Sequence, residues 1–386
     1  MTGSVGGAGV ETVVIGGGAM GSATAWQLAA RGRDVLLLEQ FEPGHIHGAS
    51  HGASRNFNVT YSHPTFVSML VEALPLWREL EGETSAQVNS AQLLNLVGIV
   101  NHGHRTDYDA VLAALTAAGI PAEFLAVDEA SRRWPGIRFD QRVLYTPQAG
   151  RLDADRSVAA LQAAARSHGA EVRHGARVQR LDVVDDERVR VTYVDASGTT
   201  SVLARTAVVT VGAWTSKLLA GVMRHPSLVV TQEQPAHFAP IDDALEWPGF
   251  NHSPDPRDPR YDYWPSGIYG TLTPGEGVKA GWHGVGPVID PDTRSYQPEP
   301  AQFAALQRYA REWLPGVDAD RATPISCTYT TSPDSNFIVD RIGPVVVGAG
   351  FSGHGFKFTP VIGRMLADLV NETRAAPAIF ALDAVR

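Results

Sequence analysis

A strand, a glycine turn, a helix and a second strand follow one another between Val13 and Glu39, and this order constrains the fold more than any other feature of the sequence. The apolar run 12–15 stops at the turn GGGAMG, residues 16–21, and small and apolar residues then continue at helical spacing. A second apolar run, 35–38, ends at the acidic residue Glu39. The pattern predicts a βαβ unit with two buried parallel strands.

Each glycine of the turn has a mechanical role in binding a dinucleotide. Gly16 permits the tight turn, Gly18 lets the backbone approach a pyrophosphate, and Gly21 allows the helix and the strand to pack closely. The helix directs free amide groups and its positive dipole end at the phosphates, and Gly32 closes it with a left-handed cap. Glu39 can accept hydrogen bonds from the ribose hydroxyls, which disfavours NADP but does not separate NAD from FAD.

Composition limits the remaining classes of protein. With 386 residues, 44% of them hydrophobic and 19% charged, the chain is globular and long enough for two domains or one domain with a large insertion. No apolar run reaches the roughly 18 residues of a membrane span, and we expect the leader 1–11 to be a disordered tail and the protein to be cytoplasmic. One cysteine excludes an internal disulfide, and a net charge of −9 without a basic block argues against nucleic acid.

Lysine is rare in this chain. Only three of the 32 basic residues are lysines, namely Lys217, Lys279 and Lys357. Arginine does not replace a compact ammonium group where the chemistry needs one. We therefore expect Lys279 and Lys357 to be functional and Lys217, in a helix after Trp214, to lie on the surface.

The loop after Glu39 contains the polar run HIHGASHGASR and should reach back over the bound cofactor. We predict no metal site here, because no carboxylate or cysteine accompanies the histidines at ligand spacing. We interpret His45 and His47 as ordinary loop residues, and we expect His51 and Arg55 to contact flavin or substrate.

The rest of the chain alternates between helical and strand patterns. We predict helices over 66–81, ending near Gly82, and over 108–118, 155–167 and 360–371; a strand over 93–100; an antiparallel meander over 171–174, 177–184, 189–195 and 201–205; and buried strands over 207–211 and 344–348. Alternating strands with proline-rich loops over 229–313 indicate a second domain on an antiparallel sheet. The chain then returns to the nucleotide domain, where Thr359 is a suitable N-cap and Pro360 a suitable first helical residue.

Six separated motifs occur in one collinear order: GGGAMGSATAWQLAARG, SHGASR, TVGAWTSKLL, GVKAGWHG, CTYTTSPDSNFIVD and GAGFSGHGFKF. Together they resemble the monomeric sarcosine oxidases and N-methyltryptophan oxidases, which belong to the D-amino-acid-oxidase-like flavoproteins. The resemblance implies an α/β fold in which a Rossmann-like FAD-binding domain is interleaved with an antiparallel-sheet α+β substrate domain. We assign 1–84, 145–224 and 324–386 to the FAD-binding domain and 85–144 and 225–323 to the substrate domain.

The resemblance also implies an activity. Such enzymes oxidise a secondary or tertiary amine, here an N-alkyl amino acid-like molecule, to an imine and then an aldehyde, while oxygen becomes hydrogen peroxide. The expected partners are a small-molecule amine and molecular oxygen, with no nucleic acid and no membrane, and the chain is expected to be a monomer or a homodimer.

Matching the motifs assigns roles to single residues. Cys327 falls where the family attaches FAD through a thioether, although a lone cysteine can also be a small buried hydrophobe. Lys279 falls where the family places its oxygen-activating lysine, whose charge stabilises a superoxide-like species. Lys357 would bind the substrate carboxylate. The helix that follows it would stabilise the negative charge of the reduced flavin through its N-terminus.

The complete set of predicted site residues has three parts. The catalytic residues are Lys279, His283, Arg55 and Tyr329. The substrate-binding residues are Lys357, Asn58, Tyr269 and Tyr61. The cofactor-binding residues are Gly16, Gly18, Ala19, Met20, Gly21, Glu39, Gln40, Ser50, His51, Ser54, Arg55, Val178, Gly212, Trp214, Cys327, Gly353, Gly355, Phe356 and Lys357.

One position departs from the family pattern. The family usually has an arginine, two apolar residues and a second arginine after the glycine loop, whereas this chain has Arg55-Asn56-Phe57-Asn58. The flavin-facing arginine is present, but half of the carboxylate clamp is missing. This departure argues against sarcosine as the substrate and leaves the flavin chemistry unaffected.

Three other functions remain open from the sequence alone. The glycine turn also fits a nicotinamide-dependent dehydrogenase. A flavin-dependent dehydrogenase could pass its electrons to an acceptor other than oxygen, against which Lys279 argues. A non-catalytic flavin-binding module fits least, because the polar pocket residues would then have no purpose.

Overall fold

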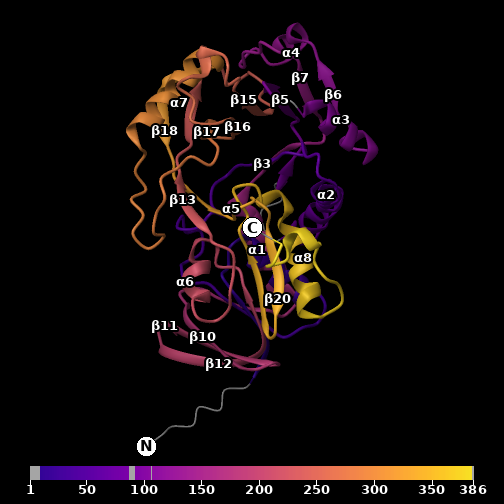
Figure 1. Ribbon diagram of the computed structural model, residues 1–386, viewed down its shortest axis with the longest axis vertical. Helices are drawn as coiled ribbons and strands as arrows, with labels where there is room; N and C mark the ends of the chain where they lie inside the picture. The colour runs from indigo at the N-terminus through magenta and orange to yellow at the C-terminus, as the bar shows by residue number, and fades with distance from the viewer. Residues whose placement is uncertain (1–8, 87–91, 106, 385–386) are drawn as a thin grey trace, which may run out of the picture.

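The computed structural model describes residues 9–86, 92–105 and 107–384. These residues form two lobes along the long axis of the molecule, called here the lower and the upper lobe after their places in Figure 1. Each lobe is built on one eight-stranded sheet. The described residues include no helix that is both long and apolar enough to cross a membrane.

The sheet of the lower lobe contains the predicted βαβ unit. Its central strands follow the order β10-β11-β12-β1-β2-β9, and β21 joins β12 and β20. The bounds are β1 Val10–Ile15, β2 Val35–Leu38, β9 Glu171–Arg173, β10 Arg177–Asp185, β11 Arg188–Asp195, β12 Gly198–Val209, β20 Ile338–Ile342 and β21 Val345–Ala349. The helices of this lobe are α1 Ala19–Ala29, α2 Pro64–Thr84, α5 Ala154–Ser167, α6 Thr215–Leu219 and α8 Thr359–Val370.

The geometry of the glycine turn confirms the sequence argument. β1 and β2 are parallel, and β1 also pairs in parallel with β12. Gly16 has a φ of +95°, which favours glycine, and a Cβ on Gly21 would lie 1.9 Å from the carbonyl oxygen of Gly16. Any side chain at Gly21 would therefore push α1 away from β1. Gly32 ends the helix with a φ of +74°.

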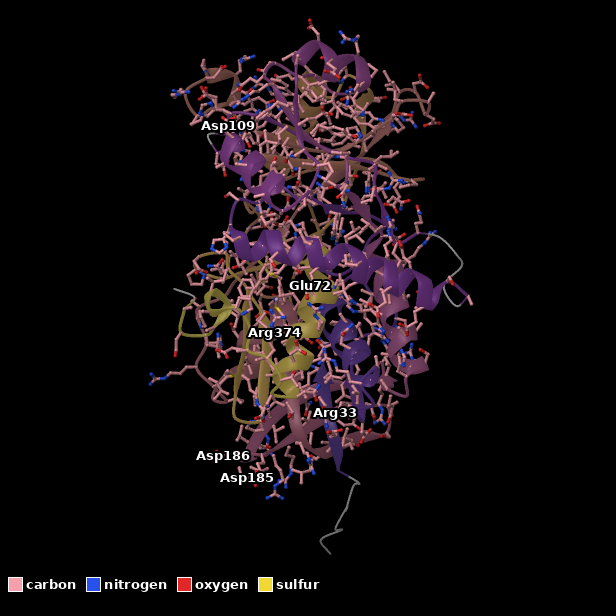
Figure 2. All side chains as sticks on the ribbon, turned by 90° about the vertical axis from the view of Figure 1, so that its right-hand side faces the viewer. Arg33, Glu72, Asp109, Asp185, Asp186 and Arg374 are labelled. Atoms are coloured by element: carbon pink, nitrogen blue, oxygen red, sulfur yellow. The ribbon has the colours of Figure 1, made fainter. Side chains whose placement is uncertain are left out.

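The helices cover the lower sheet in layers. α1 packs against α5 and α8, and α2 packs against α5 and α8 in turn. Figure 2 shows α2, with Glu72 on it, running across the end of α8, and it places Asp109 in the upper lobe and Asp185 at the lower end. The aromatic side chains Trp77, Phe337 and Phe358 are fully buried in this core.

The sheet of the upper lobe has the order β18-β14-β17-β16-β15-β5-β7-β6. The bounds are β5 Ile99–Gly103, β6 Glu123–Leu125, β7 Val143–Thr146, β14 Ala236–Pro240, β15 Gly249–Ser253, β16 Ile268–Thr273, β17 Gly277–Trp282 and β18 Val317–Pro324. Its helices are α3 Tyr108–Ala117, α4 Val127–Arg133 and α7 Pro300–Trp313. All of its pairs are antiparallel except that of β5 and β15.

The two faces of the upper sheet differ in chemistry because side chains alternate along each strand. On β17, Val278, Ala280 and Trp282 enter an apolar cluster beneath α7. Lys279 and His283 belong to the opposite face. This polar face therefore forms one wall of the site described below.

Two smaller sheets join the lobes. β3 Arg55–Phe57, β8 Gly150–Leu152 and β4 Leu94–Asn95 form one, and β13 Val229–Glu233 and β19 Cys327–Thr331 form the other. The sequence placed β13 in the antiparallel sheet of the second domain, but it pairs with β19 instead. The boundaries assigned to the two domains stay a prediction.

The strand predicted over 93–100 is divided between two sheets. β4 ends at Asn95 and β5 begins at Ile99. Gly98, which lies between them, has a φ of +75°. This left-handed residue redirects the backbone, and an apolar pattern does not encode such a turn.

The predicted meander is wrong in two respects. β9 is parallel to β2 and therefore belongs to the βαβ layer. β12 is one strand from Gly198 to Val209, where the sequence suggested two. Its first part pairs with β11 in antiparallel fashion and its last part pairs with β21 in parallel fashion, so one strand serves both arrangements.

Three predicted ends of elements are also wrong. α2 continues through Gly82 to Thr84. Thr359 is the first residue of α8 rather than its N-cap, and its hydroxyl donates to the carbonyl of Phe356 at 2.7 Å. Residues 1–8 of the predicted tail lie outside the described residues, and Val10 and Glu11 belong to β1.

His102 and His252 form a stacked pair in the core of the upper lobe, with ring centroids 3.8 Å apart. Both are buried, and neither Nδ1 nor Nε2 of His102 has a hydrogen-bond partner among the described residues. Burial lowers the pKa of His102 to about 3 and that of His252 well below its usual value. The pair is therefore neutral in the folded protein.

We expect this pair to make the upper lobe labile in acid. Below about pH 6.5 each of these histidines is protonated in the unfolded chain but not in the folded chain. Each further drop of one pH unit therefore lowers the free energy of unfolding by about 1.4 kcal/mol per histidine. His102→Phe should reduce the loss of unfolding free energy between pH 7 and pH 5 by about 2 kcal/mol. Denaturation followed by tryptophan fluorescence measures this, with His225→Phe as the control. An unchanged pH dependence in His102→Phe would contradict the expectation.

Candidate functional site

Two cavities meet where the lobes join. The first has a volume of about 800 Å³ and the second about 880 Å³. Both are lined by Arg55, Cys327, Tyr329, Gly353 and Phe356. A molecule in the first cavity can therefore reach a molecule in the second at these five residues.

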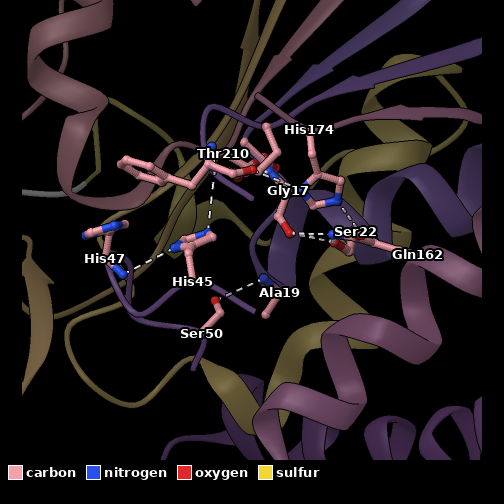
Figure 3. Close-up of polar contacts among 12 residues, drawn as sticks. Gly17, Ala19, Ser22, His45, His47, Ser50, Gln162, His174 and Thr210 are labelled. Atoms are coloured by element: carbon pink, nitrogen blue, oxygen red, sulfur yellow. Dashed lines mark hydrogen bonds and ion pairs between the residues drawn. The ribbon is translucent and has the colours of Figure 1, made fainter. Parts of the chain in front are cut away.

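The first cavity begins at the glycine turn and the N-terminus of α1. The first-turn amides of a helix have no partner within the helix, so they pair with a side chain or a ligand outside it. The amide of Ala19 donates to Ser50 Oγ at 3.0 Å, and the amide of Gly17 donates to Glu39 Oε2 at 2.7 Å (Figure 3). A Cβ on Gly18 would lie 3.1 Å from Ser50 Oγ and would narrow the cradle.

Glu39 occupies the end of β2, as the sequence predicts. Its side chain is buried, and its Oε1 accepts the amide of Phe41 at 3.0 Å. His45 Nε2 lies 3.6 Å from the same oxygen. Burial lowers the pKa of His45, and the carboxylate of Glu39 opposes this shift.

Sequence reasoning missed three residues around this turn. His45 lines the first cavity and contacts Glu39, although the sequence analysis interpreted it as an ordinary loop residue. Gln162 Nε2 on α5 donates to the carbonyl of Gly17 at 2.9 Å, and His174 Nε2 lies 2.9 Å from Gln162 Oε1 (Figure 3). No motif signals these contacts. Gln162 and Gly17 lie 145 residues apart in the sequence, and the two shorter-range contacts depend on how the chain folds back.

Most of the predicted cofactor residues line the first cavity. They are Gly16, Gly18, Ala19, Met20, Glu39, Gln40, Ser50, Arg55, Val178, Gly212, Trp214, Cys327, Gly353, Gly355 and Phe356. Gly21 lies behind them and packs α1 onto β1. His51, Ser54 and Lys357 line only the second cavity. The volume of the cavity and the helix N-terminus at its wall together fit a dinucleotide such as FAD.

Arg55 and Cys327 lie at the junction of the cavities. Arg55 Nη2 lies 3.7 Å from Cys327 Sγ. The same guanidinium donates to the carbonyls of Ser54, Ala49 and His51, so it also holds the loop that precedes β3. The thiol of Cys327 is half-buried and free.

Lys279 is on the polar face of the upper sheet, 4% exposed. Its ammonium group donates to the carbonyl of Ser54. Burial, with a smaller effect of Arg55, lowers the pKa of Lys279 to about 7. About half of the Lys279 side chains are therefore protonated at pH 7, and no carboxylate neutralises that charge among the described hydrogen-bond and ion-pair partners of Lys279.

Lys357 approaches the second cavity from the opposite side, in a short 3-10 turn just before α8. It is 5% exposed, and its Nζ donates to Tyr61 Oη at 3.0 Å and to the carbonyl of His354 at 2.8 Å. Burial lowers the pKa of Lys357 to about 7. A buried ammonium held by two neutral oxygens can bind an anion.

The remaining predicted residues also line the second cavity. Tyr329 Oη lies 3.3 Å from His283 Nδ1, and Tyr269 borders the same space. Burial lowers the pKa of His283, with a smaller effect of Lys357, and raises the pKa of Tyr329. Both groups are therefore neutral at pH 7. Asn58 Oδ1 accepts the hydroxyl of Thr60 at 2.8 Å, so its oxygen is engaged locally.

The structure thus gathers Lys279, His283, Arg55, Tyr329, Lys357, Asn58, Tyr269 and Tyr61 around one cavity. Lys217 lies outside that cavity and pairs with Asp290 and Asp292 at the surface, as expected, but it also lines the first cavity. Among the residues with described coordinates, no group of three or more metal-ligating side chains is arranged to hold a metal ion.

Comparison with known proteins gives one consistent family. The model of the FAD dependent oxidoreductase family matches residues 11–369. The monomeric sarcosine oxidase of a Bacillus species is 30% identical over 97% of this chain and 95% of its own. The N-methyl-L-tryptophan oxidase of Yersinia pestis is 27% identical over 92% of this chain and 94% of its own.

A solved structure gives the same answer. The open form of NikD, an unusual amino acid oxidase essential for nikkomycin biosynthesis, superposes with a TM-score of 0.82. It is 28% identical in sequence, and the match covers 96% of this chain and 97% of that one. The fold and the order of the elements are therefore shared along almost the whole length.

The pKa of Lys357 predicts how anion binding depends on pH. The ammonium form is present below about pH 7 and is lost above it. The dissociation constant of a small monocarboxylate should therefore rise about tenfold for each pH unit above pH 7. Calorimetric titration between pH 6 and pH 9 measures this.

Two variants identify the group responsible. Lys357→Arg should bind without this pH dependence, because a guanidinium stays charged. Lys279→Met, which removes the other buried lysine of the cavity, should retain it. A wild-type affinity that is constant across this range would contradict the assignment to Lys357.

Proposed function

Because the chain belongs to the FAD dependent oxidoreductase family and groups there with the sarcosine oxidases, we propose that it is an oxidase of a secondary or tertiary amine. The substrate is an N-alkyl amino acid-like molecule. The amine and oxygen give an imine and hydrogen peroxide, and water then hydrolyses the imine to an aldehyde or oxo acid and a smaller amine.

The buried charge of Lys279 carries this proposal. FAD, when bound, takes two electrons and a proton from the carbon–nitrogen unit of the amine and delivers the electrons to oxygen. Lys279 lies on the wall of the second cavity, close to the residues that both cavities share. Its positive charge stabilises the negative charge that develops on oxygen, and the surrounding low polarity strengthens that effect.

The other residues bind and orient the amine. Lys357 holds the carboxylate of the substrate. Tyr269 and Tyr329 border the reacting group, and the neutral ring of His283 accepts a hydrogen bond or a proton from the amine nitrogen. The amine must lose its proton before oxidation, because a protonated nitrogen has no lone pair to form the imine.

The alternative is a dehydrogenase that passes the electrons to an acceptor other than oxygen. Lys279 favours the oxidase, and peroxide measured at turnover decides between the two. The cytoplasmic location and the choice between monomer and homodimer stay predictions.

We expect FAD to be attached covalently to Cys327. The sole cysteine of the chain is placed where both cavities meet, 3.7 Å from a guanidinium nitrogen of Arg55. Denatured wild-type protein should keep its flavin fluorescence on a gel, and Cys327→Ser should lose it. Acid precipitation that releases all flavin from the wild type would refute the link.

Lys279→Met should slow the reaction with oxygen much more than the oxidation of the amine. A fixed charge lowers only the barrier of the step in which negative charge grows on oxygen, and each tenfold loss corresponds to about 1.4 kcal/mol. Stopped-flow absorbance separates anaerobic reduction from reoxidation. Arg321→Met, at an exposed position outside both cavities, is the control, and slow reduction with normal reoxidation would reject the role.

Asn58 argues for a substrate other than sarcosine. Asparagine offers a neutral donor where the family has a second cation, and charge-assisted hydrogen bonds are roughly twice as strong as neutral ones. Sarcosine should therefore be a poor substrate, and Asn58→Arg should raise its kcat/KM about tenfold. Peroxide release measures both. Efficient turnover of sarcosine by the wild type, without a gain in Asn58→Arg, would contradict this interpretation.

A further inference from the structure

The second cavity is larger than a small amino acid requires. Cavities of roughly 300–1,000 Å³ hold drug-sized ligands, and this one has about 880 Å³. The carboxylate and the amine of the proposed substrate account for the space beside Lys357 and Lys279. The lining also includes Asn56, Asn101 and Asn251.

The register of the upper sheet places two of these asparagines in one row with Tyr269, which borders the proposed reacting group. Tyr269 on β16 is opposite Asn251 on β15, and Asn251 is opposite Asn101 on β5. Residues directly opposite one another point to the same face of a sheet. The two asparagines therefore continue the wall that Tyr269 begins, and with strands about 4.8 Å apart the row extends about 10 Å.

The hydrogen bonds of this row leave capacity for a ligand. Asn251 Nδ2 donates to Asn101 Oδ1 at 2.9 Å, and Thr60 Oγ1 lies 3.1 Å from the same oxygen. Within the described residues, the side-chain oxygen of Asn251 accepts no hydrogen bond. An amide on the cavity wall with a free acceptor can pair with a donor of the substrate.

Asn56 supplies a second free acceptor from the other side. Its Oδ1 is buried without a hydrogen-bond partner in the described part of the chain. It lies 3.6 Å from the point where a Cβ would stand on Gly249, which precedes Asn251 by two residues on the same face. An unpaired buried acceptor costs stability, so a ligand in the adjoining cavity that pairs with it would stabilise the protein.

The positive charge of Arg105 is already neutralised. Arg105, which also lines the cavity, donates from Nε to Asp107 Oδ1 at 2.5 Å and from Nη2 to Oδ2 at 2.9 Å. The asparagine side chains themselves are uncharged. The lining therefore suits a neutral group that both donates and accepts hydrogen bonds.

We propose that Asn56, Asn101 and Asn251, the asparagine subsite, bind a carboxamide carried on the side chain of the amine substrate. The subsite rests on the proposed function, because it uses the same cavity and the same orientation of substrate. The NH₂ of the carboxamide donates to the free oxygens of Asn56 and Asn251, and its oxygen accepts from the amides of the row.

Binding of non-oxidisable analogues tests the subsite in the holoenzyme. In these probes a sulfur atom that carries a methyl group replaces the amine nitrogen. The three side chains are that of glutamine, that of glutamate and a hydrocarbon of the same shape, in which two methyl groups replace the oxygen and the nitrogen of the amide. Methylthioacetate, which has no side chain, is the reference. Calorimetry and the change in flavin absorbance both measure the dissociation constants without turnover.

We expect the carboxamide probe to bind at least about tenfold more tightly than its hydrocarbon isostere and than the carboxylate probe. Asn251→Leu and Asn56→Leu should each abolish this preference and leave the affinity of methylthioacetate unchanged. Asn95→Leu, which lies outside both cavities, should retain it. Asn56→Leu should also melt at or above the wild-type temperature, because it removes an unpaired acceptor, and so it serves where Asn251→Leu folds poorly.

The outcomes separate the two proposals. Equal affinities for the three side-chain probes, or the tightest binding for the carboxylate probe, would overturn the subsite while methylthioacetate binding still supports the amine site. If the wild-type holoenzyme does not bind methylthioacetate at all, the proposed function is overturned. A preference that survives both leucine variants would place the carboxamide elsewhere and reject the subsite.

Discussion

Two ammonium groups buried in one cavity constrain the structure around the site. Lys279 and Lys357 are almost completely buried, and carbonyl and hydroxyl oxygens hold them without a carboxylate among their described partners. Removing a charge from water is costly, and here the cost is expressed as a pKa near 7 for both. A rigid sheet on one side and the turn before α8 on the other keep the groups in place.

The sequence predicts those features of the fold that depend on local patterns. Gly16, Gly21 and the apolar runs beside them define the βαβ unit because each has a separate steric reason. The rarity of lysine directs attention to Lys279 and Lys357, which lie on the same cavity. Local patterns fail at Gly98 and at β9, where the backbone conformation or the choice of a partner strand depends on distant parts of the chain.

The parts of the site that sequence reasoning missed are tertiary contacts between side chains and the groups they support. Gln162 supports the glycine turn from α5, and His174 supports Gln162 from the segment after β9. His45 meets Glu39 only because the loop between them folds back. A single sequence contains no periodicity for such pairs. His51, Ser54 and Lys357 were expected at the cofactor for a related reason, since residues near a junction of cavities can line either side.

One segment, 49–61, connects the two cavities. Ser50 meets the N-terminus of α1, the carbonyl of Ser54 accepts the ammonium of Lys279, and Arg55 approaches Cys327. Beyond Arg55 the same segment turns toward the substrate end, where Asn58 and Thr60 join the amide network of the upper sheet. Changes after Arg55 can therefore alter the choice of substrate without moving the groups that face the cofactor. Under the proposed function, this separation lets Arg55, the proposed flavin-facing arginine, occur together with Asn58 in place of the second arginine that the family pattern leads us to expect.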